Sequence, residues 1–115
     1  MAEAFVLDRA AILDRLGGDE EIYAMMLDMY LSDFRSNCDA LTAALAAGDA
    51  PTVRREAHTV KGLLATFSDD VGARDALLIE QQAKAGELAG LDAPVADICR
   101  RLHEVAGVLA SAAGR

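Results

Sequence analysis

Apolar residues recur every three or four positions along most of this chain, which is the spacing of an amphipathic helix. The clearest run falls within residues 51–68, at a 4-3-4-3 spacing: Val53, Ala57, Val60, Leu64 and Phe67. A second run falls within residues 94–112, at a 3-4-3-4 spacing: Val95, Ile98, Leu102, Val105 and Leu109. Each segment therefore predicts a helix with one buried face.

Three further helices are predicted from capping residues and helix breakers. Residues 8–16 form a short amphipathic segment that stops at a Gly-Gly pair. Residues 19–47 predict a long helix capped by Asp19, with these inward positions: Ile22, Met26, Met29, Phe34, Cys38, Leu41 and Leu45. Residues 71–88 predict a helix whose inward stripe is Ala76, Ile79 and Ala83. Asp49 is the expected cap of the 51–68 helix, with Pro51 at an early helical position.

The connections between these segments are short, so sequential helices should be antiparallel. The predicted fold class is all-α: an antiparallel up-and-down four-helix bundle with a short additional N-terminal helix. Aromatic residues make up only 4% of the chain, and the composition excludes an all-β fold. A length of 115 residues predicts a single domain over residues 1–115.

Charge and hydropathy narrow the possible partners. The chain has 19 acidic and 11 basic residues, a formal net charge of −8, which disfavours binding to nucleic acid or to an anionic membrane. It has neither a leader-like N-terminus nor a long uncharged apolar run, so we expect a cytoplasmic protein. The basic residues Arg54, Arg55 and Lys61 fall close together, where an anionic ligand would bind.

The two cysteines, Cys38 and Cys99, show neither a CxxC motif nor the spacing of metal ligands. Both fall among apolar helical positions, so we expect buried free thiols.

His58 is the residue that the helical pattern leaves unexplained. Successive helical residues rotate by about 100°, so His58 points about 140° away from the mean direction of the apolar stripe. Arg54 lies at about 100°, Lys61 at about 80°, Arg55 at about 200° and Gly62 at about 180°. The imidazole is therefore expected to face solvent, between cations.

Gly62 supports a functional role for His58. A glycine inside a helix costs about 1 kcal/mol relative to alanine, so its presence one turn after His58 calls for a reason. Without a side chain there, another molecule could approach the imidazole closely. A neutral imidazole is a nucleophile near pH 7, and neighbouring cations would stabilise a phosphoryl group in transfer.

The segment REAHTVKGLLATF at residues 55–67 resembles the signature of histidine-containing phosphotransfer (HPt) domains, A-H-x-L-K-G-[SA]. The matching positions are Ala57, His58, Thr59, Lys61 and Gly62, with Val60 in place of the usual Leu. IEQQAKAG at residues 79–86 resembles the L-E-x-x-A-x-x-G segment of the same family, and LAAGDAPTVRREAH resembles the family's approach to the histidine. Together the resemblance covers about residues 19–112.

The resemblance implies a phosphorelay intermediate. His58 would take a phosphoryl group from a receiver-domain aspartyl phosphate or a partner kinase, and pass it through Nε2 to another receiver aspartate. Lys61 would neutralise phosphate charge, and Gly62 would provide clearance. Glu80 would accept a hydrogen bond from Nδ1–H of His58, and Lys84 would add charge to the same rim. Glu80 and Lys84 also fit a solvated i,i+4 ion pair, and that alternative stays open.

Arg54 and Arg55 are expected to steer an acidic partner rather than to touch phosphate. The implied partners are response-regulator receiver domains and a hybrid sensor histidine kinase, bound by a monomer. No cofactor is expected on this chain, and Mg²⁺ is expected in the receiver domain. No Gly-rich nucleotide loop is visible, so ATP-dependent kinase activity is not expected of the chain by itself.

Three positions depart from the family pattern. Leu63 stands where a small residue is usual, Ser68 where glycine commonly ends the helix, and Gly72 near a position that is often apolar. These departures leave the path of residues 67–73 open.

We considered two alternatives to phosphotransfer, a metal-bearing helical bundle and a non-catalytic interaction module. A metal-bearing bundle would need a Glu three residues before a His, and neither His58 nor His103 has one. His103 is therefore expected to be a surface or rim residue. The other alternative is a non-catalytic helical interaction module that binds receiver domains without being phosphorylated.

Overall fold

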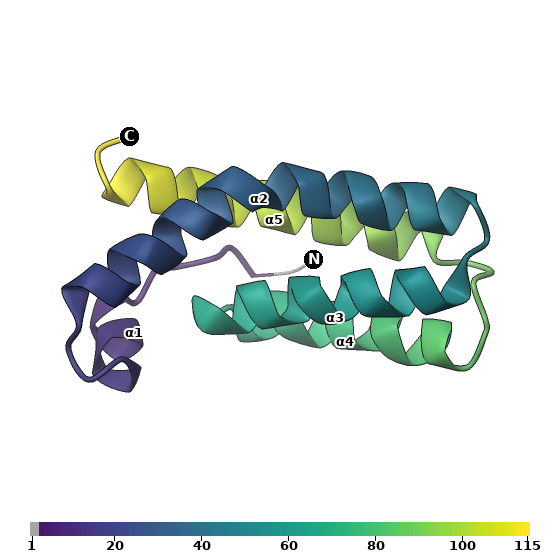
Figure 1. Cartoon of the computed structure of the whole chain (residues 1–115), viewed down its shortest axis with the longest axis horizontal. Coiled ribbons are helices and arrows are strands. Elements are labelled where there is room, and N and C mark those ends of the chain that lie inside the picture. Colours follow the sequence, from purple (N-terminus) through teal and green to yellow (C-terminus); the bar gives the residue numbers. More distant parts are fainter. Residues whose placement is uncertain (1–2) are drawn as a thin grey trace.

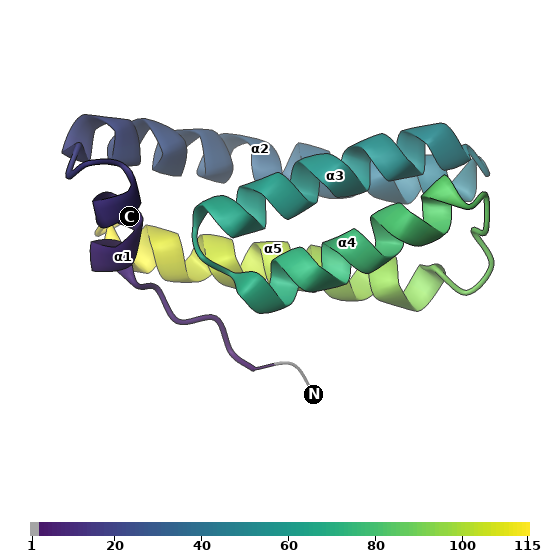
Figure 2. The same cartoon turned by 90° about the horizontal axis from the view of Figure 1, so that it is seen from below.

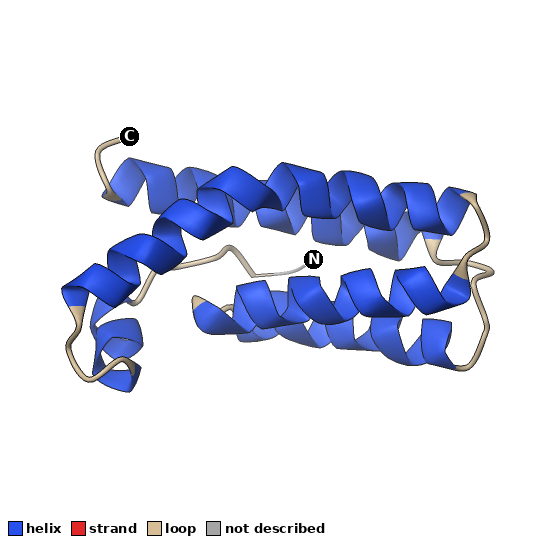
Figure 3. Cartoon of the chain, viewed as in Figure 1, coloured by secondary structure: helices blue, strands red, loops and turns tan. Residues whose placement is uncertain are grey.

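The computed structural model describes residues 3–115, which form five helices and contain no strand, as Figure 3 shows. No helix in this range is long and apolar enough to cross a lipid bilayer. The helices are α1 (Arg9–Arg15), α2 (Glu20–Ala46), α3 (Ala50–Thr66), α4 (Asp70–Lys84) and α5 (Asp92–Ala112).

The four longer helices alternate in direction along one common axis. α2 and α5 lie side by side at one edge of the bundle, and α3 and α4 lie side by side at the other (Figures 1 and 2). α3 is therefore diagonally opposite α5, while α1 lies at the end of the bundle where α2 begins (Figure 1). This is the predicted antiparallel up-and-down bundle with a short N-terminal helix.

Aspartates begin four of these helices. The Asp19 carboxylate accepts hydrogen bonds from the main-chain N–H groups of Glu21 and Ile22, which confirms its predicted role as an N-cap. The same type of cap begins α1, α3 and α4, from Asp8, Asp49 and Asp69 respectively. Local sequence therefore determines where most of the helices start.

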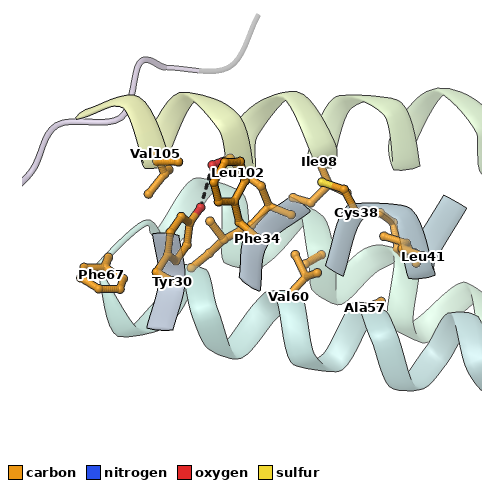
Figure 4. Packing of buried hydrophobic residues seen from close by; sticks show 14 of the residues in the cluster. Tyr30, Phe34, Cys38, Leu41, Ala57, Val60, Phe67, Ile98, Leu102 and Val105 are labelled. Atoms are coloured by element: carbon orange, nitrogen blue, oxygen red, sulfur yellow. Dashed lines mark hydrogen bonds between the residues drawn. The ribbon is translucent and has the colours of Figure 1, made fainter. Parts of the chain in front are cut away.

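The apolar stripes predicted for α3, α4 and α5 are buried in the common core, part of which is shown in Figure 4. The stripe predicted for the first half of α2 is wrong at two positions, because Ile22 is 42% exposed and Met29 is 59% exposed, whereas Met26 is partly buried against the core. The buried positions there are Tyr23, Leu27 and Tyr30.

Periodicity could not select this face, because apolar residues surround the first half of α2. Packing selects it instead. The Tyr30 ring meets Phe67 edge to face with centroids 5.4 Å apart, and its hydroxyl donates a 2.8 Å hydrogen bond to the main-chain oxygen of Leu102 (Figure 4). Tyr30 thereby joins α2 to the end of α3 and to α5.

The turn between α3 and α4 shows how Ser68 replaces the usual glycine. Ser68 has a φ of 61°, in the left-handed region that glycine enters most easily. Arg15 from α1 donates to Ser68 Oγ at 2.7 Å and to the main-chain oxygen of Thr66 at 2.9 Å. A cation at the C-terminal end of α3 also interacts favourably with the helix dipole. Contacts from Arg15 of α1 thus stabilise the turn in which Ser68 stands in place of the family's usual glycine.

The helix predicted over residues 71–88 ends four residues earlier, at Lys84. Gly86 has a φ of 78°, and its N–H donates to the main-chain oxygen of Ala83. The N–H of Glu87 reaches back to the oxygen of Gln82. This is the Schellman arrangement, in which a left-handed glycine turns the chain away from the helix axis.

Candidate functional site

His58 lies near the middle of α3 and points away from the core. Its side chain is 66% exposed, whereas Ala57 before it and Val60 after it are fully buried. The rotation of about 100° per residue produces this contrast, because it puts His58 on the solvent-facing side of α3 while Ala57 and Val60 lie on the side packed in the bundle. The prediction that the imidazole faces solvent is confirmed.

Glu80 of α4 holds the imidazole in one orientation. Its Oε2 lies 3.0 Å from Nδ1 of His58, as the family resemblance implied. Glu80 directly follows the buried Ile79, so it lies where α4 meets α3, with only 15% of its side chain exposed. The carboxylate therefore contacts the ring from the junction of the two helices, on the side that faces away from open solvent.

Lys61 occupies the other oxygen of the same carboxylate. Its Nζ lies 2.9 Å from Oε1 of Glu80, and its side chain is 28% exposed. Oε1 is buried and lacks a well-directed hydrogen bond, so the Lys61 contact is chiefly an ion pair. Sequence reasoning assigned Lys61 to phosphate and missed this contact, because it depends on how α3 and α4 pack. Glu80 thus connects an imidazole and an ammonium group.

The surroundings of Glu80 keep it ionised. Partial burial acts to raise the pKa of this carboxyl, but the interactions with Lys61 and then with His58 outweigh it, so the pKa is lowered from its ordinary value. A carboxylate that carries its charge at neutral pH is a good acceptor for Nδ1–H. It also stabilises positive charge on the ring.

The hydrogen bond to Glu80 decides which ring nitrogen is available. A carboxylate accepts and does not donate, so Nδ1 carries the proton and the neutral ring has its lone pair on Nε2. Nε2 makes no hydrogen bond to any group in residues 3–115, and the ring is largely exposed. The site therefore presents a nucleophilic nitrogen to an incoming molecule.

Of the other predicted site residues, the two arginines lie beside His58 and Glu80, whereas Lys84 forms no ion pair with Glu80. Arg54 and Arg55 line a shallow depression of about 360 Å³ beside His58 and Glu80, together with Pro51. Lys84 is exposed at the end of α4, and no ion pair among the described residues includes it, so the alternative of a Glu80–Lys84 pair is wrong.

Gly62 is exposed one turn after His58. A Cβ built on it would meet nothing within 4 Å apart from the neighbouring main chain of its own helix. The bundle therefore does not require a glycine here.

The second histidine lies in different surroundings. His103 of α5 is exposed, as predicted for a surface or rim residue, and its Nδ1 lies 2.9 Å from the main-chain oxygen of Cys99. Its ring packs edge to face on Phe34 with centroids 4.9 Å apart. Residues 3–115 contain no group of three or more His, Cys, Asp or Glu side chains placed to hold a metal ion.

Comparison with known proteins identifies the family to which this arrangement belongs. The family model described as the Hpt domain matches residues 25–111. The chain belongs to the Hpt domain family. This Hpt domain is also similar to the crystal structure of histidine-containing phosphotransfer protein B (HptB) from Pseudomonas aeruginosa PAO1. The two share 28% sequence identity with a TM-score of 0.82, over 95% of each chain. A search of curated proteins returned no match.

Membership in the family makes the chain a histidine phosphotransfer module. Both histidines of this Hpt domain lie within the matched residues. The family match therefore does not by itself distinguish them, whereas their surroundings do.

Proposed function

We propose that this Hpt domain is a phosphorelay intermediate that carries a phosphoryl group on Nε2 of His58. The observation that carries the proposal is the 3.0 Å contact between Nδ1 of His58 and Glu80, which leaves Nε2 unprotonated and exposed. The Nδ1 of His103 also faces an oxygen, but this is the uncharged main-chain oxygen of Cys99 and not a carboxylate, so it does not offset positive charge on the ring in the same way, and the ring packs on Phe34.

In the proposed reaction, a receiver domain supplies the phosphoryl group as an aspartyl phosphate. The Nε2 lone pair attacks phosphorus, the P–O bond to the aspartate breaks, and the aspartate leaves as a carboxylate. The ring then carries positive charge, which the Glu80 carboxylate offsets through Nδ1–H. Attack by the aspartate of a second receiver reverses these steps and returns His58 to its neutral form.

Lys61 and the two arginines have distinct proposed roles. Lys61 is fixed to Glu80 one turn from His58, so its charge lies close to an incoming phosphoryl group. Arg54 and Arg55 line the depression beside the ring and would attract the acidic pocket of a receiver domain. The proposed partners are receiver domains and a hybrid sensor histidine kinase, with Mg²⁺ held by the receiver.

The experiment is incubation of the protein with a panel of phosphorylated receiver domains, for the wild type, His58→Gln and His103→Gln. We expect acid-labile, alkali-stable phosphate on the wild type and on His103→Gln, and none on His58→Gln. Because His58 is exposed, His58→Gln should change the free energy of unfolding by less than about 0.5 kcal/mol.

His103→Gln is the matched control, since it removes the other exposed histidine of the same family-matched region. Labelling of His58→Gln at the wild-type level would refute the assignment. If the wild type bound receivers and yet took no phosphate from any of them, the chain would instead be a non-catalytic interaction module.

A further inference from the structure

The two cysteines, 61 residues apart in sequence, meet where α2 packs against α5. Each Sγ lies 3.9 Å from the main-chain oxygen of the other residue, so the contact is reciprocal. Both thiols are free. The prediction of buried free thiols is confirmed for Cys38, whereas Cys99 is only half-buried. That prediction did not foresee that the two residues meet, because their contact depends on how α2 and α5 pack.

The two thiols differ in their access to solvent. Cys38 is 6% exposed and lies within the core between Phe34 and Leu41 of α2 (Figure 4). Cys99 is only half-buried, at the margin of the same helix pair. A small reagent can therefore reach Cys99 more easily than the neighbouring Cys38.

The surroundings of the pair also differentiate their chemistry. A hydrogen bond from the Cys38 thiol lowers the pKa of Cys99 to about 7, against the opposing effect of burial, and Thr42 and His103 act in the same direction. The pKa of Cys38 is raised by its hydrogen bond to Cys99 and by burial. The more accessible sulfur is therefore the better nucleophile for an incoming oxidant.

We propose that Cys38 and Cys99 form a peroxide-reactive dithiol that closes into an intramolecular disulfide between α2 and α5. The Cys99 thiolate attacks one oxygen of a hydroperoxide and the O–O bond breaks, so that Cys99 becomes a sulfenic acid. The departing alkoxide or hydroxide takes up a proton from solvent and leaves as an alcohol or water. The Cys38 thiol then gives up its proton as its sulfur attacks the Cys99 sulfur, the S–O bond breaks, and the departing hydroxide takes up a proton and leaves as water. The two thiols lose two electrons, and the peroxide gains them.

This site is separate from the proposed phosphorelay function, because neither cysteine belongs to α3 or α4. It requires only the α2–α5 packing, in which an accessible thiol and a buried partner lie side by side. A thiol pair in this arrangement resolves a sulfenic acid within one chain, before a second oxidant molecule can oxidise it further.

The test is exposure of the full-length reduced protein to limiting hydrogen peroxide, followed by intact mass and peptide mapping without reductant. We expect loss of both free thiols, a monomer that is lighter by two hydrogen atoms, and a linked pair of peptides containing Cys38 and Cys99. Dithiothreitol should restore both thiols. Oxidation should also raise the melting temperature, since the new bond would close a long loop of the unfolded chain.

Two single variants provide the controls. In Cys38→Ser, Cys99 should gain oxygen or form a disulfide between two chains, because the resolving thiol is gone. In Cys99→Ser, Cys38 should stay reduced over the same period, because it is buried in the core. If wild-type Cys99 gained oxygen without forming the Cys38 link, or if the wild type formed only disulfides between chains, the proposal would be overturned.

Discussion

Two carboxylates, Asp69 at the start of α4 and Glu80 within it, each bond to a basic side chain of another helix, Arg101 and His58 respectively. The surroundings of the two pairs differ. The Asp69 side chain is 2% exposed and that of its partner Arg101 is 9% exposed. Glu80 is also largely covered, but its partner His58 is 66% exposed. One pair is enclosed on both sides, and the other has one open member.

The enclosed pair fastens the end of the bundle where α3 turns into α4. Arg101 Nε donates to Asp69 Oδ2 at 2.8 Å and Arg101 Nη2 donates to Oδ1 at 2.7 Å, a two-pronged geometry. The same carboxylate caps α4 by accepting from the N–H of Gly72. Arg101 also donates to the main-chain oxygen of Glu3 and lies 3.4 Å from Glu104. One ion pair thus joins α4, α5 and the N-terminal segment.

Gly72 is part of this arrangement. A Cβ on it would lie 2.2 Å from Oδ2 of Asp69 and 2.9 Å from Leu64, so no larger residue fits without moving the ion pair. This explains the departure from the usual apolar residue near this position. Gly62 shows the opposite case, because nothing in the bundle occupies the space above it.

The difference in exposure suits the Asp69–Arg101 pair to a structural role and the Glu80–His58 pair to a chemical one. A charge pair removed from water on both sides contributes to one fixed geometry and has no free atom for a reaction. At Glu80 the carboxylate is enclosed but the imidazole keeps one nitrogen free. The enclosed Glu80 carboxylate sets the orientation of the imidazole ring, and the exposed Nε2 of His58 is available to a partner protein.

The largest effect on stability is expected for Asp69→Asn. This change keeps the size of the side chain but leaves the Arg101 charge buried without its carboxylate, which should lower the free energy of unfolding by about 3 kcal/mol or more. Urea denaturation measures this loss. The control is Asp97→Asn, since Asp97 pairs with Arg100 on the exposed surface and should change stability by only about 0.5 kcal/mol. Equal effects of the two variants would contradict the distinction.

A smaller effect, chiefly on the rate of phosphoryl transfer, is expected for Glu80→Gln. The amide can still accept from Nδ1–H, but it no longer offsets positive charge on the ring. The rate of phosphoryl acceptance from one receiver should fall on the order of tenfold, or about 1.4 kcal/mol in the barrier. Rapid-quench time courses beside a thermal melt separate rate from folding. Glu21→Gln, at the start of α2, should leave the rate unchanged, and a wild-type rate in Glu80→Gln would argue against the electrostatic role.

The smallest effect on the fold is expected for Gly62→Gln, which should still block docking. Glutamine is a better helix former than glycine, so the variant should be more stable by up to about 1 kcal/mol while transfer slows. Gly107→Gln is a close match, because Gly107 is exposed within α5, diagonally opposite α3, and its added Cβ also meets nothing within 4 Å. Gly107→Gln should gain similar stability and transfer normally. Transfer at the wild-type rate in Gly62→Gln would remove the clearance argument.

The sequence by itself determined the helices and the outward direction of His58. Both depend on interactions within a few residues: the aspartate caps, the spacing of apolar positions and the constant rotation per residue along α3. The resemblance to HPt domains added the contact between His58 and Glu80, which periodicity does not predict. Local rules were insufficient for the first half of α2, because residues such as Ile22 and Tyr23 were both apolar enough to be buried.

Tertiary structure alone decided which of the remaining residues meet. Asp69 and Arg101 are separated by 32 positions, and the two cysteines by 61, so no local pattern links either pair. Lys61 turned toward Glu80 because α3 and α4 pack with both side chains at their junction. Such contacts depend on the angle and register between helices, which the whole core sets together, and a periodic pattern along one helix carries no information about them.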